Sequence, residues 1–189
     1  MCVMMGGFEQ QYFSKDGARL ALLVNGAPDL HLNELPGVCK GDGVSGIVYG
    51  LSEGRFEVIA EGEKTLLDGL IDSVRSAAGA DASLREAWQA PVGGYTDAFP
   101  IVELAPKMGA RITLTAQEET LDYIQRHLQI EAVFNRGLTL KKSRIGASTI
   151  ALECKGKSER LKSFVRWCYN GPYLATPEEV KVEWETLKE

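Results

Sequence analysis

The sequence has no long apolar segment, and its beginning has no feature of a secretion signal. Within its 189 residues, no apolar run approaches the roughly 20 residues that a transmembrane helix needs. The segment 1–7 lacks the charged and apolar regions of a signal peptide. We therefore expect an intracellular protein without a membrane span. A cytoplasmic and an organellar location both fit, because a mature organellar protein has already lost its targeting segment.

Cysteine and histidine are scarce, with 4 and 2 copies in the chain. The cysteines are Cys2, Cys39, Cys154 and Cys168, and no two of them form a CxxC pair. Cys154 and Cys168 stand at apolar positions of an internal repeat, which predicts small core residues. A reactive thiol at Cys39 is the disfavoured alternative, because no base is predicted near it.

Metal, nucleotide and nucleophile motifs are missing as well. Asp29 and His31 have the spacing of half a metal site, but a turn or helix start is the favoured interpretation. Gly41-Asp42-Gly43 lacks the third glycine and the strand-to-helix setting of a dinucleotide fingerprint. The chain has no P-loop and no nucleophile elbow. We expect neither a metal ion nor a cofactor.

Charge is unevenly distributed along the chain. Residues 1–98 have 7 basic and 14 acidic residues, whereas residues 99–189 have 14 and 12, so net charges of −7 and +2 make up the total of −5. The basic excess includes Arg136, Lys141, Lys142, Arg144, Lys155, Lys157, Arg160, Lys162 and Arg166. A solvated face is the favoured interpretation, and an anion or acidic protein surface is the alternative. Nucleic acid is disfavoured, because the whole chain is acidic and has no aromatic RNA-binding signature.

Three blocks of sequence recur in the same order about ninety residues apart. Residues 17–20 return as 109–112, residues 56–74 as 150–168 at one constant offset, and residues 85–88 as 181–184. In the last block Trp88 corresponds to Trp184. Three ordered matches with near-constant spacing indicate a duplicated unit. We therefore predict two domains, over residues 1–98 and 99–189.

The second copy has the clearer pattern. Residues 111–115 alternate like a half-buried strand, and residues 118–134 have Leu121, Ile124, Leu128 and Ile130 at approximately helical spacing. Residues 136–142 and 148–155 read as a hairpin around Gly146. Ser158 is the predicted N-cap of a helix that ends at 170–172, and residues 179–185 form the last strand. The order is β-α-β-β-α-β.

The first copy repeats this order with an irregular first helix. Strands are predicted at 20–24, 44–51 and 55–61, and a helix at 63–78. Residues 27–40 should form the first helix, which Pro28 is suited to begin and Pro36 to break. Residues 102–104 are suited to an extra strand. The predicted fold class is therefore α+β, with two tandem ferredoxin-like domains, each a four-stranded antiparallel sheet with two helices on one face.

The chain resembles the acylphosphatase domain family over about half of its length. The resemblance depends on residues 156–157, 161–172 and 180–184 of the second copy, and on residues 46–51 and 54–62 of the first. Members of this family hydrolyse carboxyl-phosphate anhydrides without a metal or cofactor. Their phosphate site is a loop after the first strand, in which backbone N–H groups and a final arginine cradle the phosphate. An asparagine on the next hairpin positions the attacking water.

Both copies depart from that site. In the first, Glu34 stands at the arginine position and Gly50 at the asparagine position. In the second, Ile124 and Lys141 occupy those positions, although Tyr123 suits the aromatic one. A carboxylate facing a phosphate dianion repels it. The resemblance thus implies two degenerate copies without the catalytic clamp.

Three hypotheses about function follow. The leading one is a non-catalytic protein that binds other proteins as an accessory or assembly subunit of a larger complex. The second is an acylphosphatase-type hydrolase with a rearranged site, for which Arg126 and Lys141 are the candidate catalytic residues. The third is a regulatory domain that binds a small molecule or anion, a role that duplicated ferredoxin-like domains suggest at the level of fold alone. The candidate anion-binding residues are Arg126, Lys141, Lys142 and Arg144.

Overall fold

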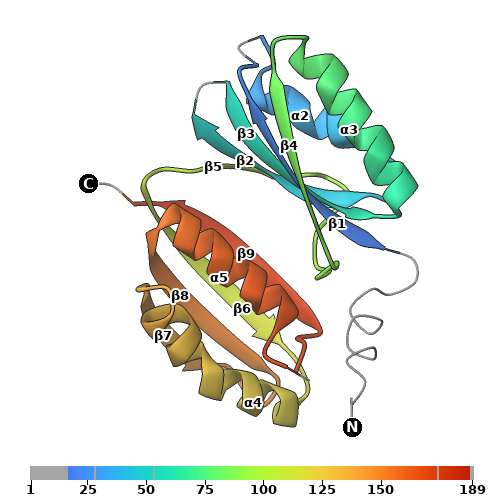
Figure 1. The fold of residues 1–189 in the computed structure, drawn as a ribbon. Coiled ribbons are helices and arrows are strands. Elements are labelled where there is room, and N and C mark those ends of the chain that lie inside the picture. The colour runs from blue at the N-terminus through green and yellow to red at the C-terminus, as the bar shows by residue number, and fades with distance from the viewer. Residues whose placement is uncertain (1–16, 28, 53, 174, 188–189) are drawn as a thin grey trace, which may run out of the picture. The chain divides into compact units, whose positions relative to one another are not determined.

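The computed structural model describes residues 17–27, 29–52, 54–173 and 175–187. The chain divides into two compact units, Met1–Glu103 and Leu104–Glu189 (Figure 1). Cys2 and Pro28, which the sequence analysis singled out, lie outside the described residues. Among the described helices, none has the length and apolar character required to cross a membrane.

The first unit contains one sheet of five strands in the order β4-β1-β3-β2-β5. Its elements are β1 (Ala18–Asn25), η1 (Leu32–Glu34), α2 (Leu35–Cys39), β2 (Ser45–Ser52), β3 (Arg55–Gly62), α3 (Lys64–Ala78), β4 (Ser83–Gln89) and β5 (Ile101–Glu103). The predicted extra strand is present as β5, which pairs in parallel with β2. This sheet therefore has one strand more than the four predicted for each domain. The first unit extends to Glu103 rather than ending after residue 98, because β5 belongs to its sheet.

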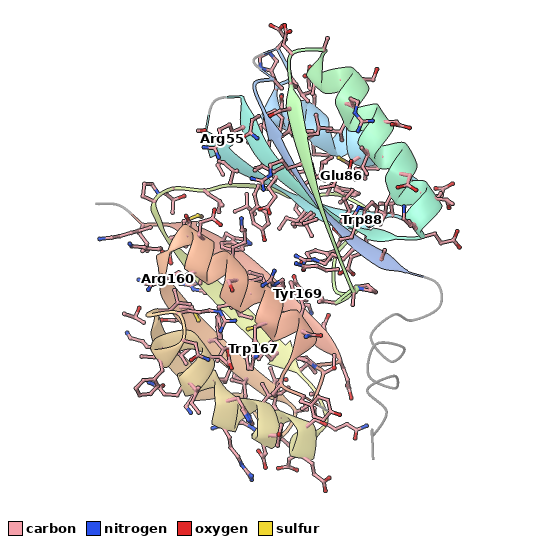
Figure 2. All side chains as sticks on the ribbon, in the orientation of Figure 1. Arg55, Glu86, Trp88, Arg160, Trp167 and Tyr169 are labelled. Atoms are coloured by element: carbon pink, nitrogen blue, oxygen red, sulfur yellow. The ribbon has the colours of Figure 1, made fainter. Side chains whose placement is uncertain are left out.

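Both helices of the first unit cover the same face of its sheet (Figure 1). The buried side of α3 carries Leu67, Leu70, Ile71 and Val74, and it joins α2 residues Leu35 and Cys39 in one core with β1 and β3. At the edge of this face, α3 also contacts β4. Lys64 Nζ lies 4.7 Å from the centroid of the Trp88 ring, and Arg75 Nη2 lies 3.7 Å from Glu86 Oε1. Figure 2 labels the two β4 residues, Glu86 and Trp88.

The predicted irregular helix is two short pieces, η1 and the five-residue α2. The sequence analysis expected Pro36 to break the helix, but it does not. It stands in the first turn of α2, where its missing N–H has no helical partner to lose.

The second unit contains a sheet in the order β7-β8-β6-β9. Its elements are β6 (Lys107–Thr115), α4 (Glu118–Gln129), the π-helix η2 (Ile130–Phe134), β7 (Thr139–Arg144), β8 (Thr149–Lys157), α5 (Ser158–Asn170) and β9 (Glu179–Thr186). All three strand pairs are antiparallel. Numbered within each unit, both sheets share the strand order 4-1-3-2, which defines the ferredoxin-like fold. The predicted fold class is confirmed.

Three local predictions in the second unit were wrong. Ile130 is 50 % exposed, because it lies two residues beyond Leu128 and a helix turns by about 200° in that step. Arg136 is not in a strand, since β7 begins at Thr139. Ser158 is the first residue of α5 rather than its N-cap, and its N–H donates to the carbonyl of Pro106.

Strand pairing gives the register of the repeat. Leu20 pairs with both Ala60 and Trp88, and Ala110 pairs with both Cys154 and Trp184. The second and third repeated blocks therefore occupy matching places in the two sheets. The first block does not, because the counterpart of Leu20 is Ala110 rather than Ile112. Its sequence match is two residues out of structural register.

Candidate functional site

The face of each sheet opposite its helices differs between the two units. In the first unit this face carries the buried apolar side chains Ile47, Tyr49, Ile59 and Val102. In the second unit it carries charged and small residues on all four strands. The first face therefore has a buried apolar centre with the Arg19–Glu61 pair at one end, and the second is the polar face to which candidate binding residues belong.

The segment after β4 crosses one end of the open face of the first sheet; we call residues 90–100 the strap. Glu61 on β3 accepts hydrogen bonds from the strap amides of Val92 (2.6 Å) and Gly93 (2.8 Å). Further on, Gly46 N–H on β2 donates to Thr96 O (2.9 Å), and Val48 N–H donates to Pro100 O (3.0 Å). The strap thus runs from one edge of the sheet to the other before it becomes β5.

A buried ion pair lies beside the strap. Arg19 and Glu61 are 4 % and 7 % exposed, with 3.9 Å between Arg19 Nε and Glu61 Oε1. Arg19 also donates to Gln89 Oε1 (2.6 Å), while its Nε has no hydrogen-bond partner. Burial raises the pKa of Glu61, and its two amide donors and Arg19 oppose the rise. Glu61 thus holds the strap to the sheet, and its carboxylate beside Arg19 already neutralises the guanidinium charge.

The open face of the second sheet is hollowed into a trough of about 510 Å³. Its floor has the small side chains of Thr113, Ser143 and Ala151, which lie side by side on neighbouring strands. Charged side chains of both signs surround the floor: Arg111, Lys141, Lys181, Glu153 and Glu183. The row of small residues, which ends in Lys181, lies beside the row of long charged ones and makes the hollow. The trough is the candidate binding site of this unit.

The charges of the trough alternate across the sheet. Lys141 on β7 pairs with Glu153 on β8, Glu153 pairs with Arg111 on β6, and Arg111 pairs with Glu183 on β9. Opposite charges on directly facing residues stabilise a sheet by roughly 0.2–1 kcal/mol per pair. This row has two cations and two carboxylates. With Lys181 from the neighbouring row, the trough presents three cations and two carboxylates to a ligand.

The four sequence-predicted anion-binding residues do not form one site. Lys141 and Lys142 both border the trough, but only Lys141 extends its side chain into it. Lys142 and Arg144 pair with Leu152 and Ile150, so their side chains lie on the helix side of the sheet. Arg126 is exposed on α4, which packs on that helix face. The sheet therefore separates Lys141 from the other three residues.

Arg144 already has partners from two segments, α4 and the β7–β8 turn. Its guanidinium donates to Asp122 and Gln125 of α4 and to the carbonyl groups of Gly146 and Ala147 in the β7–β8 turn. Its side chain is 26 % exposed. Arg144 therefore connects α4 to the turn, and its donors are occupied by the protein itself.

Replacing Arg144 with alanine is expected to lower the free energy of unfolding of the second unit by about 2 kcal/mol, because several charge-assisted hydrogen bonds are lost together. Lys142→Ala is the matched control, since Lys142 lies on the same side of the same strand and is exposed. It should change stability by less than about 0.5 kcal/mol. Urea unfolding of both variants is the measurement. Equal effects would contradict the structural role of Arg144.

The phosphate-cradle positions of the acylphosphatase pattern have other uses in both units. After β1, the N–H groups of Gly26 and Ala27 both donate to Gly54 O, at 3.0 and 3.3 Å. Glu34 accepts a hydrogen bond from His31 N–H (3.0 Å) and caps η1. After β6, Ile124 is wholly buried in the core, and Glu118 and Glu119 occupy the first turn of α4. Neither loop therefore has the final arginine that the pattern requires, since Glu34 and Ile124 stand in its place.

The described cysteines are all buried. Burial raises the pKa of the Cys39 and Cys154 thiols to about 12 and that of Cys168 well above its ordinary value. Thiols in this state are not nucleophiles at neutral pH. Among the described residues, no three His, Cys, Asp or Glu side chains come together as metal ligands.

Comparison with known proteins gives likeness of fold only. No family model matches the chain, and no curated protein matches it. Among solved structures, an acylphosphatase from Coxiella burnetii is 14 % identical, with 44 % of this chain and 86 % of that chain covered and a TM-score of 0.39. An acylphosphatase from Bacillus subtilis is 21 % identical over 45 % and 98 %, with a TM-score of 0.32. The regulatory subunit of aspartate kinase from Thermus thermophilus is 9 % identical over 78 % and 87 %, with a TM-score of 0.31.

The class that fold and site define is a chain of two ferredoxin-like α+β units, one of which has a charged trough on its open sheet face. Of the trough residues, sequence reasoning found Lys141 and missed Arg111, Lys181, Glu153 and Glu183. The missing signal was strand register, because these residues are neighbours only across strands.

Proposed function

We propose that this chain is a non-catalytic binding protein, derived from two acylphosphatase-like domains, that acts as an accessory or assembly subunit of a larger complex. The origin by duplication is supported by the common 4-1-3-2 strand order and by the matching places of Trp88 and Trp184. The loss of phosphate chemistry is supported by Glu34 and Ile124, which have structural roles at the arginine positions.

The observation that carries a binding role is the trough on the second sheet. It is a concave surface with a regular alternation of charge, formed by side chains that extend from rigid strands. Such a surface recognises a protein segment of complementary charge order, because facing like charges exclude wrong registers. We propose that the partner docks there, over Arg111 and Lys141.

The test is affinity capture from the native source, followed by sizing of the complex and identification of its members. Arg111→Glu and Lys141→Glu should each lose the stoichiometric partner, because both reverse a charge inside the trough. Lys142→Glu is the matched control and should keep the partner, since the Lys142 side chain lies on the helix side of the sheet although its backbone borders the trough. Equal capture by all four proteins would overturn the docking site, and a free monomer throughout would overturn the accessory role.

A second candidate function is a regulatory site for a small anionic molecule, which the three cations of the trough favour over an uncharged ligand. Inorganic phosphate and small carboxylates serve as probes in thermal unfolding. A rise in melting temperature that Lys141→Glu abolishes would favour this role over pure assembly. A hydrolase that joins Arg126 to Lys141 is not supported by the geometry, because the sheet lies between them. Measurable turnover of an acyl phosphate would reverse that conclusion.

A further inference from the structure

The outward face of α4 and η2 carries a row of large apolar side chains, which we call the α4 stripe. Its members are Tyr123, His127, Ile130 and Phe134. Tyr123, Ile130 and Phe134 are 41 %, 50 % and 77 % exposed, and the ring centroids of Tyr123 and His127 lie 4.7 Å apart. The inward face is a separate apolar row, Leu121, Ile124 and Leu128, each wholly buried. The helix is therefore apolar on two sides, and the core of its own unit uses only one.

The spacing of the stripe fits another helix. Steps of four, three and four residues are those of the seam in a coiled coil. From Tyr123 to Phe134 the stripe is about 16 Å long at 1.5 Å per residue. Single exposed apolar residues on a protein surface are ordinary, whereas a continuous row marks an interaction site. A helix with its own apolar row is the occupant with matching geometry.

The charges at the two ends of the stripe identify that helix as another α4. Its N-terminal end is acidic, with Glu118 and Asp122 held by Arg144 and Glu119 exposed. Its C-terminal end is basic: Arg136 is paired with Glu131, and Arg160 at the start of α5 donates to Arg136 O (3.1 Å) (Figure 2). No ion pair of the described residues involves Glu119 or Arg160. Each end thus has one exposed charge, Glu119 or Arg160, that lies outside these ion pairs.

An antiparallel second copy matches both ends at once. It places the acidic end of each stripe on the basic end of the other. The twofold axis then gives two equivalent pairs, each between Glu119 of one copy and Arg160 of the other. Antiparallel packing also opposes the two helix dipoles favourably. We propose that this chain forms a twofold symmetric dimer through antiparallel packing of the α4 stripes, independently of any partner at the trough.

Sedimentation velocity of the full chain over a range of concentrations tests the dimer. We expect a concentration-dependent dimer, and we expect Phe134→Ser combined with Ile130→Ser to raise its dissociation constant by roughly a hundredfold, because the two most exposed apolar side chains of the stripe are lost together. Ile145→Ser is the matched control, because Ile145 is 58 % exposed in the β7–β8 turn and lies off the stripe. It should leave the dissociation constant within about twofold of wild type.

Charge exchange tests the antiparallel arrangement. Glu119→Arg and Arg160→Glu should each weaken the dimer by roughly tenfold, and the double variant should recover most of the loss, since each pair is then re-formed with reversed sign. Far-ultraviolet circular dichroism verifies that every variant is folded. A protein that is monomeric at all concentrations would overturn the proposal. So would a dimer that the combined Phe134→Ser and Ile130→Ser variant leaves unchanged, or a double charge variant weaker than both single ones.

Discussion

Replacing Glu61 with alanine is expected to lower the free energy of unfolding of the first unit by about 3–5 kcal/mol, the range for removing one partner of a buried ion pair. Arg19 would keep its charge at 4 % exposure without a carboxylate beside it. The amides of Val92 and Gly93 would lose their acceptor at the same time. Urea unfolding followed by tryptophan fluorescence measures the change.

The control for this prediction removes both charges. Arg19→Met combined with Glu61→Leu fills similar space with apolar atoms and should be more stable than Glu61→Ala alone, because no unpaired charge is left behind. A loss below about 1 kcal/mol in Glu61→Ala would show that the strap does not depend on this carboxylate. If the double variant has a lower free energy of unfolding than Glu61→Ala, we would conclude that the two charges have a net stabilising role.

Replacing Gly46 with alanine is expected to destabilise the first unit by about 3 kcal/mol, the upper part of the range for overpacking a core. The added methyl group would overlap the carbonyl oxygen of Ile59 and the ring of Phe99, which is wholly buried. Neither neighbour is free to move, since Ile59 O is backbone and Phe99 fills the core. The melting temperature of the variant, measured by circular dichroism, is the readout.

Gly69→Ala is the matched control for Gly46→Ala. Gly69 is exposed in the middle of α3, and a methyl group there meets no atom within 4 Å. Alanine should stabilise the helix by about 0.5–1 kcal/mol, because it has the higher helix propensity. The two substitutions are chemically identical and should move stability in opposite directions. A stabilised Gly46→Ala variant would contradict the packing of Phe99 against β2.

The elements of the fold could be predicted because each has a strong local pattern. The alternation of residues 111–115 fixed a strand, and the helical spacing of Leu121, Ile124 and Leu128 fixed the buried side of α4. Ile130 was misassigned because apolar character alone does not distinguish a residue of the core from one of the α4 stripe. Position around the helix does, and it places Ile130 on the other side.

The two-residue error in the repeat has a simple physical cause. Side chains of a strand alternate with a period of two, so a shift of two residues keeps every apolar residue on the same face. Ala110 and Ile112 are both buried on the helix side of β6, and the sequence pattern does not separate them. Only hydrogen-bonded pairing with Cys154 and Trp184 selects Ala110.

The candidate site was less predictable than the fold, because it depends on neighbours that are distant in sequence. Lys141 and Lys142 are adjacent in the chain and both border the trough, yet strand register places only the Lys141 side chain on the open face. Arg144 reads as a surface cation in the sequence, whereas its contacts come from α4 and a turn. Strand register and side-chain reach decide these roles, and neither is encoded in a short motif.

The strap also determines where this chain can be cut or lengthened. A fragment that ends at residue 98 keeps four antiparallel strands but lacks Phe99, which covers Gly46, and Pro100, whose carbonyl accepts from Val48 N–H. The last pairing of the first unit is Glu103, and the first bond of the second is at Pro106 O. A boundary drawn after Glu103 therefore keeps Phe99, Pro100 and β5 with the sheet that they complete, and the second unit begins in the short connection before Pro106.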